Sequence, residues 1–121
     1  MDFSPEFRDV YRKAVEHGWG EVVDIEGTYL EEVAPDEVRD AVINDVPRYI
    51  IEDAAKAGLR CMRPRLETMG SNYFTYMIMC KGPEPNSPLV SIEAEFTYDP
   101  QTWEVVLQRL TASVIKNPIS T

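Results

Sequence analysis

Residues 90–107, VSIEAEFTYDPQTWEVVL, decide the fold. Their first half alternates polar residues with an apolar set, which predicts a strand with one buried and one wet face; that set is Val90, Ile92, Ala94, Phe96 and Tyr98. Residues 99–102, DPQT, have the composition of a turn. If Tyr98 pairs with Trp103, then Trp103, Val105 and Leu107 continue the buried face. The stretch therefore predicts an antiparallel hairpin with one apolar side.

A second hairpin is expected just before this one, over residues 59–69 and 72–81. Gly70 and Ser71 separate the two runs, and Gly followed by Ser suits a two-residue type II′ turn. That turn sets a register in which Cys61 lies opposite Cys80. Pro64 has no backbone N–H to donate, so the first of these strands should lie at the edge of the sheet. Together the hairpins predict a four-stranded antiparallel meander over residues 59–115.

The first 58 residues have helical periodicity instead. A helix is expected over residues 5–17, opened by Pro5 and ended by Gly18. Another is expected from Pro35 to about Lys56, kinked or split at Pro47. Residues 19–33 are predicted to be mostly loop, with room for one short strand. The sequence thus predicts a single α+β domain over residues 1–121, in which two to three helices pack on the meander and residues 116–121 form a frayed tail.

This order of helices followed by a curved antiparallel sheet resembles, in topology alone, the architecture of cystatin-like and nuclear-transport-factor-like domains. Such a fold leaves several functions open. One of them is a small-molecule-binding domain or cavity enzyme, in which aromatic side chains line a space between helix and sheet. The candidates for that lining are Tyr49, Tyr73, Tyr76, Tyr98 and Trp103.

Charge is distributed very unevenly along the chain. Of the 21 acidic residues, fifteen lie in residues 1–55, where only five basic residues oppose them, and the formal net charge of the whole chain is −9. A strongly acidic surface favours a basic protein partner and disfavours direct binding of nucleic acid. We therefore expect a partner-binding acidic face made by two groups of carboxylates, namely Asp24, Glu26, Glu31, Glu32, Asp36, Glu37 and Asp40.

Catalytic, cofactor and metal signatures are not found in the sequence. The single histidine, His17, is expected to cap the first helix, where a cation favours the helix dipole. The acidic residues lack the spacing of a calcium loop, so we predict no catalytic residue, no cofactor and no metal. Cys61 and Cys80 are expected to be inert thiols in a cytoplasmic protein. With no apolar run of about 18 residues, no contact with a membrane is expected.

A second candidate surface lies on the first hairpin. The predicted register puts Arg63 and Arg65 beside aromatic and aliphatic side chains on one strand face, and these residue types concentrate binding energy at interfaces. This surface would contact another protein or a second copy of the chain, giving a homodimer. The alternative is that the arginines lie across edge-strand aromatics with their charged ends in water. The neighbouring side chains are Phe74, Tyr76 and Ile78.

The function that these patterns favour is that of a non-catalytic interaction protein. Its acidic face would bind and occlude a basic surface of another protein, as inhibitors, immunity proteins and phage-type antagonists of nucleic-acid-handling complexes do. The first alternative is the small-molecule-binding or cavity-enzyme domain described above. The second alternative is a structural or assembly subunit whose acidity serves solubility.

Overall fold

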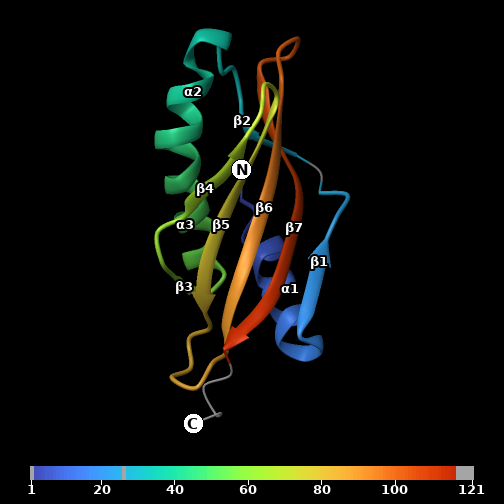
Figure 1. Cartoon of the computed structure of the whole chain (residues 1–121), viewed down its shortest axis with the longest axis vertical. Helices are drawn as coiled ribbons and strands as arrows, with labels where there is room; N and C mark the ends of the chain where they lie inside the picture. Colours follow the sequence, from blue (N-terminus) through green and yellow to red (C-terminus); the bar gives the residue numbers. More distant parts are fainter. Residues whose placement is uncertain (1, 26, 117–121) are drawn as a thin grey trace.

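The computed structural model describes residues 2–25 and 27–116, and it shows helices packed against one face of an antiparallel sheet (Figure 1). The strand order is β1-β7-β6-β5-β3, with β2 also paired to β7 and β4 also paired to β5. The strands are β1 (Trp19–Val22), β2 (Thr28–Leu30), β3 (Arg60–Cys61), β4 (Arg65–Met69), β5 (Tyr73–Lys81), β6 (Leu89–Asp99) and β7 (Glu104–Lys116). The helical elements are α1 (Ser4–His17), η1 (Pro35–Glu37), α2 (Val38–Asp40), η2 (Ala41–Asp45) and α3 (Val46–Lys56).

The α+β class and the antiparallel sheet are confirmed, but the sheet is larger than a four-stranded meander. The meander is present as β3 and β4 beside β5, β6 and β7. Two short strands, β1 and β2, extend it along the outer edge of β7, in the region predicted to be mostly loop. Each contributes only one buried residue, Gly20 or Tyr29, so neither carries the alternation from which a strand is predicted.

Each edge of the sheet consists of two short strands in place of one long strand. On one side, β1 and β2 are separated by a link in which Asp24 and Gly27 have positive φ angles of 56° and 122°. On the other side, β3 and β4 are separated by residues 62–64, which include Pro64. The prediction from Pro64 is confirmed, because β3 and β4 pair with β5 alone.

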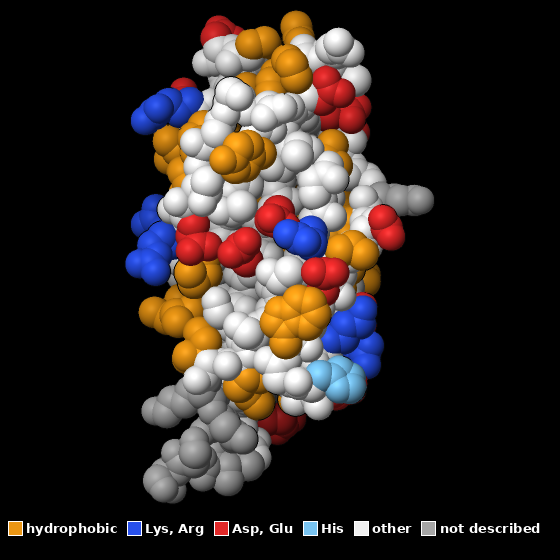
Figure 2. Space-filling view, turned by 45° about the vertical axis from the view of Figure 1, so that its right-hand side comes forward, with side chains coloured by type: hydrophobic (Ala, Val, Ile, Leu, Met, Phe, Trp, Pro, Cys, Tyr) orange, Lys and Arg blue, Asp and Glu red, His pale blue; other side chains and the backbone are white. Residues whose placement is uncertain are grey.

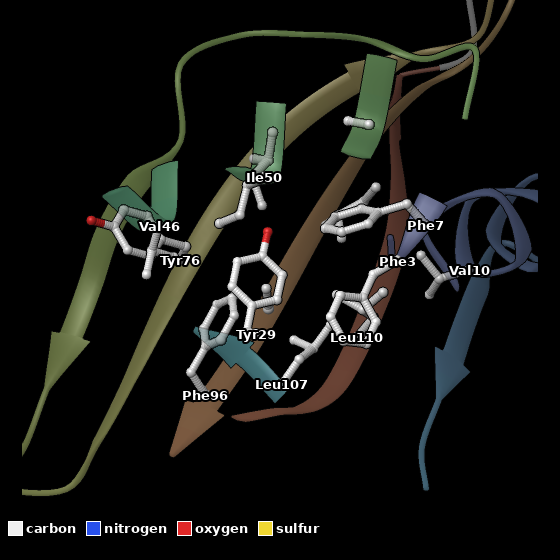
Figure 3. Packing of buried hydrophobic residues seen from close by; sticks show 14 of the residues in the cluster. Phe3, Phe7, Val10, Tyr29, Val46, Ile50, Tyr76, Phe96, Leu107 and Leu110 are labelled. Atoms are coloured by element: carbon white, nitrogen blue, oxygen red, sulfur yellow. The ribbon is translucent and has the colours of Figure 1, made fainter. Parts of the chain in front are cut away.

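The core lies between the helices and the inner face of the sheet (Figure 3). Aromatic rings join the N-terminal segment to the middle of the sheet: Phe3 stacks on Tyr29 with centroids 5.3 Å apart, and Tyr29 meets Phe96 edge-on at 5.0 Å. Phe96 in turn stacks on Phe74 of the neighbouring strand at 4.8 Å. Aromatic pairs at these separations contribute beyond the area they bury. Fully buried aliphatic side chains from both helices complete the core, including Val10, Val46 and Ile50.

The first helix confirms its prediction. Pro5 lies in its first turn, and Gly18 follows it in the left-handed conformation with φ of 83°. The chain then reverses so tightly that β1 crosses directly over α1. A Cβ added at Gly20 would lie 2.5 Å from the Cβ of Lys13 and 3.0 Å from the backbone nitrogen of Ala14. Glycine at this position therefore permits the close packing of β1 on the helix.

The second helical region is continuous from Pro35 to Lys56 but changes its hydrogen bonding along the way. A 3₁₀ turn (η1) leads into α2, and residues Ala41–Asp45 (η2) form a π-helical turn before α3. Pro47 follows that turn and lies in the first turn of α3. Proline removes one backbone donor, and a π turn is a common way for a helix to absorb such an interruption. The predicted break near Pro47 is thus a local widening of one helix.

The register of the first hairpin was predicted correctly at one end and wrongly at the other. Cys61 does pair with Cys80, but Arg65 lies opposite Met77 and Met69 lies opposite Phe74. The ladder shifts once across residues 62–64 and again at Glu67, where it is irregular. The turn spans residues 70–73, closed by a 2.8 Å hydrogen bond from the Gly70 N–H to the Tyr73 carbonyl. A one-residue shift moves every side chain to the opposite face.

The second hairpin also closes later than predicted. Tyr98 pairs with Val105 in place of Trp103, although Val105 and Leu107 are buried as expected. Trp103 lies in the turn with φ of 61° and an exposed fraction of 46%. The prediction that it belongs to the buried face is therefore wrong, because the four-residue turn is residues 100–103, one residue later than the DPQT pattern indicated.

Cys61 and Cys80 form a disulfide, which corrects the prediction that they are free thiols. Their Cα atoms are 4.0 Å apart, and Cys80 is fully buried beneath the helices. The bridge joins β3 to β5 just before the shift in register. The disulfide therefore fixes the end of the hairpin where β3 and β5 pair over only two residues each.

Asp53 of α3 is a carboxylic acid buried in the core, only 4% exposed. Burial raises its pKa from 3.8 to about 6, although the backbone N–H of Phe3 donates to it and opposes that shift. The hydroxyl of Tyr29 is buried near it and has no hydrogen-bond partner among the described residues. Burial and the neighbouring Asp53 charge raise the pKa of Tyr29 above its ordinary value.

We expect the substitution Asp53→Asn to make folding stability less dependent on pH. Because the pKa of Asp53 is higher in the folded chain than in the unfolded chain, its contribution to stability is complete below pH 3.8 and is lost as the pH rises through about 6. Urea unfolding at pH 7 should show D53N more stable than the parent by roughly 2–3 kcal/mol, with a smaller difference near pH 4. An equal difference at the two pH values would contradict this account.

Candidate functional site

Acidic side chains gather in one groove, between the end of β2 and the helical segment η1 to η2. It has a volume of about 400 Å³. Val33 and Ala41 are buried and form its floor, whereas most of the carboxylates around them are exposed. We call this the acidic groove, and it is lined by Leu30, Glu31, Glu32, Val33, Glu37, Asp40, Ala41 and Asp45.

Hydrogen bonds to the sheet fix the strand side of the acidic groove. The N–H of Val33 donates to the carbonyl of Trp103 at 2.8 Å, and the buried hydroxyl of Tyr98 donates to the carbonyl of Val33 at 2.7 Å. Glu32 has φ of 55°, so the chain turns sharply between β2 and this anchored residue. The carboxylates of this segment are therefore presented from a backbone held by the β6–β7 turn.

The helical side of the acidic groove is anchored in the same way. The buried hydroxyl of Tyr76 donates to the carbonyl of Val42 at 2.5 Å. This carbonyl lies in the π-helical turn η2, where the backbone pattern changes and helical acceptors need other partners. Both walls are thus tied to the sheet by tyrosine hydroxyls, which keeps the carboxylates of the two walls in a fixed relation.

The charged side chains that line the acidic groove are all negative. No basic residue lines it among the residues that the structure describes. Within the same described ranges, only one of its five carboxylates has an ion pair: Asp45 lies 3.7 Å from the guanidinium of Arg48, and both side chains are largely exposed. A set of exposed, like-charged groups of this kind attracts cations and repels phosphates.

The structure places four of the seven predicted acidic residues together in this groove: Glu31, Glu32, Glu37 and Asp40. Asp36 is exposed on the neighbouring turn η1 but does not line the groove. Asp24 is exposed in the link between β1 and β2, and Glu26 lies outside the described residues. Asp45 also lines the groove. From the helical spacing of the sequence alone, either Asp45 or Val46 could belong to the buried side of this helix. The π turn decides between them, since Val46 is fully buried.

The predicted interface on the first hairpin is not assembled. Phe74, Tyr76 and Ile78 are at most 2% exposed and belong to the core under the helices. Arg65 pairs with Met77 and so points to the opposite, outer face of the sheet. Arg63 is exposed in the link between β3 and β4. The shift in register separates the residues that the simple hairpin model placed on one face.

The described helices leave the outer face of the sheet uncovered (Figure 1). This face carries both hydrophobic and charged side chains (Figure 2). Trp19 and Tyr73 are about half exposed on it. Arg109 pairs with Glu95 and lies 3.7 Å from Glu21, and in Figure 2 acidic and basic side chains meet in a band across the middle of this face. A depression of about 470 Å³ beside this band is lined in part by Glu67, Glu93 and Glu95.

Glu93 is the most perturbed carboxylate on that face. Partial burial raises its pKa, and the nearby charges of Glu67 and Glu95 raise it further. Sequence reasoning placed Glu93 and Glu95 on the wet side of β6 and Glu67 on the first hairpin, and it did not bring them together. Their convergence depends on the pairing of β4 with β5 across the irregular register, which no local pattern indicates.

The five aromatic residues proposed to line a cavity between helix and sheet are either buried in the core or exposed to solvent. Tyr76 and Tyr98 are buried, and their hydroxyls are used by the backbone carbonyls of Val42 and Val33. Tyr49, Tyr73 and Trp103 are between 37% and 47% exposed. The described side chains thus use the space between the layers for packing, and these residues do not form a ligand site there.

In residues 2–25 and 27–116, no three or more His, Cys, Asp or Glu side chains are arranged to hold a metal ion. Within the part of the chain that the structure describes, no helix combines the length and the apolar character needed to cross a membrane.

Comparison of the chain with models of known protein families, with curated proteins and with solved structures found no match.

Proposed function

We propose that this protein is a non-catalytic interaction protein that binds a basic surface of another protein and covers it. The observation that carries the proposal is the acidic groove, in which carboxylates from two separate segments converge on a frame tied to the sheet. Only one of these carboxylates has an ion pair within the described part of the chain. Inhibitors and antagonists of nucleic-acid-handling proteins work in this way, because carboxylates compete for lysine and arginine side chains that otherwise hold phosphates.

The shape of the acidic groove supports a protein partner over a free cation. Its floor is apolar, and its carboxylates are spread over a volume of about 400 Å³. Exposed carboxylates at such spacing match several lysine or arginine side chains better than one small ion, which takes closely packed oxygen ligands. The net charge of −9 adds long-range attraction for a basic partner and raises the association rate at low salt.

Reversing charge in the acidic groove should abolish partner binding. We expect the double variant Glu31→Lys with Glu37→Lys to lose, at low salt, a partner that the parent chain retains from cell lysate. A matched control is Glu16→Lys with Glu84→Lys, which changes net charge equally at exposed sites on α1 and the β5–β6 connection, at the other end of the molecule (Figure 1). The control should keep the partner, and both variants should keep the parent circular-dichroism spectrum.

The same captures at about 0.5 M salt test the electrostatic origin of the binding, since screening is nearly complete at that ionic strength. The partner should be lost, and when purified it should release its nucleic acid on addition of the parent chain. If the groove variant and the parent capture the same proteins, the proposed role of the acidic groove is wrong. Recovery of the chain itself alone would favour the assembly-subunit alternative.

The proposal includes the cytoplasm as the setting, and the cysteine pair provides a test of it. Disulfides persist mainly in oxidising compartments, whereas cytoplasmic thiols are kept reduced. Because Cys61 and Cys80 are already opposite each other in the β3–β5 ladder, the thiol and disulfide forms suit the same hairpin. A reducing cytoplasm would open the Cys61–Cys80 bridge, so cells quenched in acid and treated with an alkylating agent should yield chain carrying two labels. Unlabelled chain would place the protein in an oxidising compartment.

A further inference from the structure

A second groove lies on the other side of the same helical segment, between that segment and residue 63 of the β3–β4 link. It has a volume of about 500 Å³. Its residues include Ile43, Pro47 and Ile51, which recur at four-residue spacing and so follow one side of the helix. We call it the apolar groove. Arg48, Glu52 and Arg63 are the charged residues at its margin.

The apolar groove is unusual for a solvated helix face. The inner face of this helix is already committed to the core, since Val46, Ile50 and Ala54 are buried against the sheet. A helix with one covered face normally carries polar residues elsewhere. Here Ile43 and Ile51 are each 43% exposed, and Met62 beside Arg63 is 64% exposed. Scattered exposed apolar residues need no explanation, but a continuous stripe in a groove is typical of a docking surface.

The two grooves are neighbours and meet at one ion pair. Asp45 of the acidic groove lies 3.7 Å from Arg48 of the apolar groove, so a partner that covers one reaches the other. The charge of the chain indicates which kind of partner could occupy the two grooves. A second copy of the chain would bring another net charge of −9 against the same region, which opposes self-association. A basic partner with an apolar stripe is complementary to both grooves.

The walls of the apolar groove also indicate the form of the occupant. One wall is helix, whose backbone donors and acceptors are bonded within the helix, and among the described residues the other wall is only Arg63, a single residue of the β3–β4 link. An added strand would therefore find little backbone to pair with. Recognition by side chains alone suits an amphipathic helix laid in a groove. The distance from Ile43 to Ile51 corresponds to about 12 Å of helix, or roughly two turns.

We infer, resting on the proposed function, that the partner docks an amphipathic basic α-helix along the segment from Asp40 to Ile51. Its apolar residues enter the apolar groove over Ile43, Pro47 and Ile51. Lysine or arginine residues on one flank of the docked helix face Asp40 and Asp45 in the acidic groove, where they compete with Arg48 for the carboxylate of Asp45. The opposite flank faces Arg63, which excludes a cation there and sets the direction in which the basic side must point.

The test uses a synthetic peptide of about 18 residues, made of leucine, lysine and glutamine, with leucine at helical i, i+4 spacing and lysine on one flank. A second peptide has the same composition with its leucines spread around the helix. Amide NMR spectra of the full chain at about 0.15 M salt should shift at residues 40–51 and at residue 63 with the first peptide only. Binding of both peptides with equal affinity would overturn the inference.

Variants separate the apolar contact from general charge attraction. The pair Ile43→Ser with Ile51→Ser should weaken binding of the amphipathic peptide about tenfold. The matched pair Val15→Ser with Ile115→Ser removes two similarly exposed aliphatic side chains elsewhere and should leave affinity unchanged. All four positions are exposed, so both variants should unfold at nearly the parent temperature.

The outcomes distinguish this inference from the function on which it rests. If E31K with E37K abolishes peptide binding while I43S with I51S leaves affinity unchanged, the acidic groove alone binds the partner, and the inference fails without the proposed function. If neither peptide binds, the inference fails, and the lysate experiment still decides the function. If the chain alone shows concentration-dependent shifts at residues 43–51, the occupant is a second copy and the inference is wrong.

Discussion

Two buried tyrosine hydroxyls hold the two walls of the acidic groove to the sheet. Tyr98 donates to the carbonyl of Val33 and Tyr76 donates to the carbonyl of Val42, so one strand residue anchors each wall of the acidic groove. A buried donor left without its acceptor costs more than the hydrogen bond itself contributes. The two bonds therefore fix the positions of the two walls and also stabilise the fold. Both grooves depend on them, because the helix between the grooves contains Val42.

Much of the fold was predictable because periodicity reports burial directly. The alternation in β6 and the helical stripes of α1 and α3 each match the face that is buried. The edges of the sheet were not predictable in the same way. β1 and β2 bury one residue each, and their pairing is decided by β7, far along the chain. Register in β4 depends on irregularities at residues 62–64 and at Glu67, where tertiary packing overrides the simplest turn.

The candidate site was predicted as a charge pattern and not as a shape. Glu31, Glu32, Glu37 and Asp40 were identified because acidic residues cluster in the sequence, and the return from β2 to the helix brings them to one groove. The place of Asp45 in the groove could be predicted only with knowledge of the π turn, which rotates this residue away from the buried side of the helix. The apolar groove was missed because Ile43 and Ile51 fall outside the helical stripe that was assigned to the core, and isolated exposed apolar residues are common on helices.

The divided edges of the sheet have a consequence for the protein in concentrated solution. A long, straight edge strand offers a row of unpaired backbone groups to which another chain can add, and this is a common start of fibril formation. Here both edges are interrupted, one at a proline-containing link and the other at residues with left-handed backbone. Growth of an intermolecular sheet would stop after two to five residues on each edge segment. The proposed binding through side chains could then operate without polymerisation of the chain through its backbone.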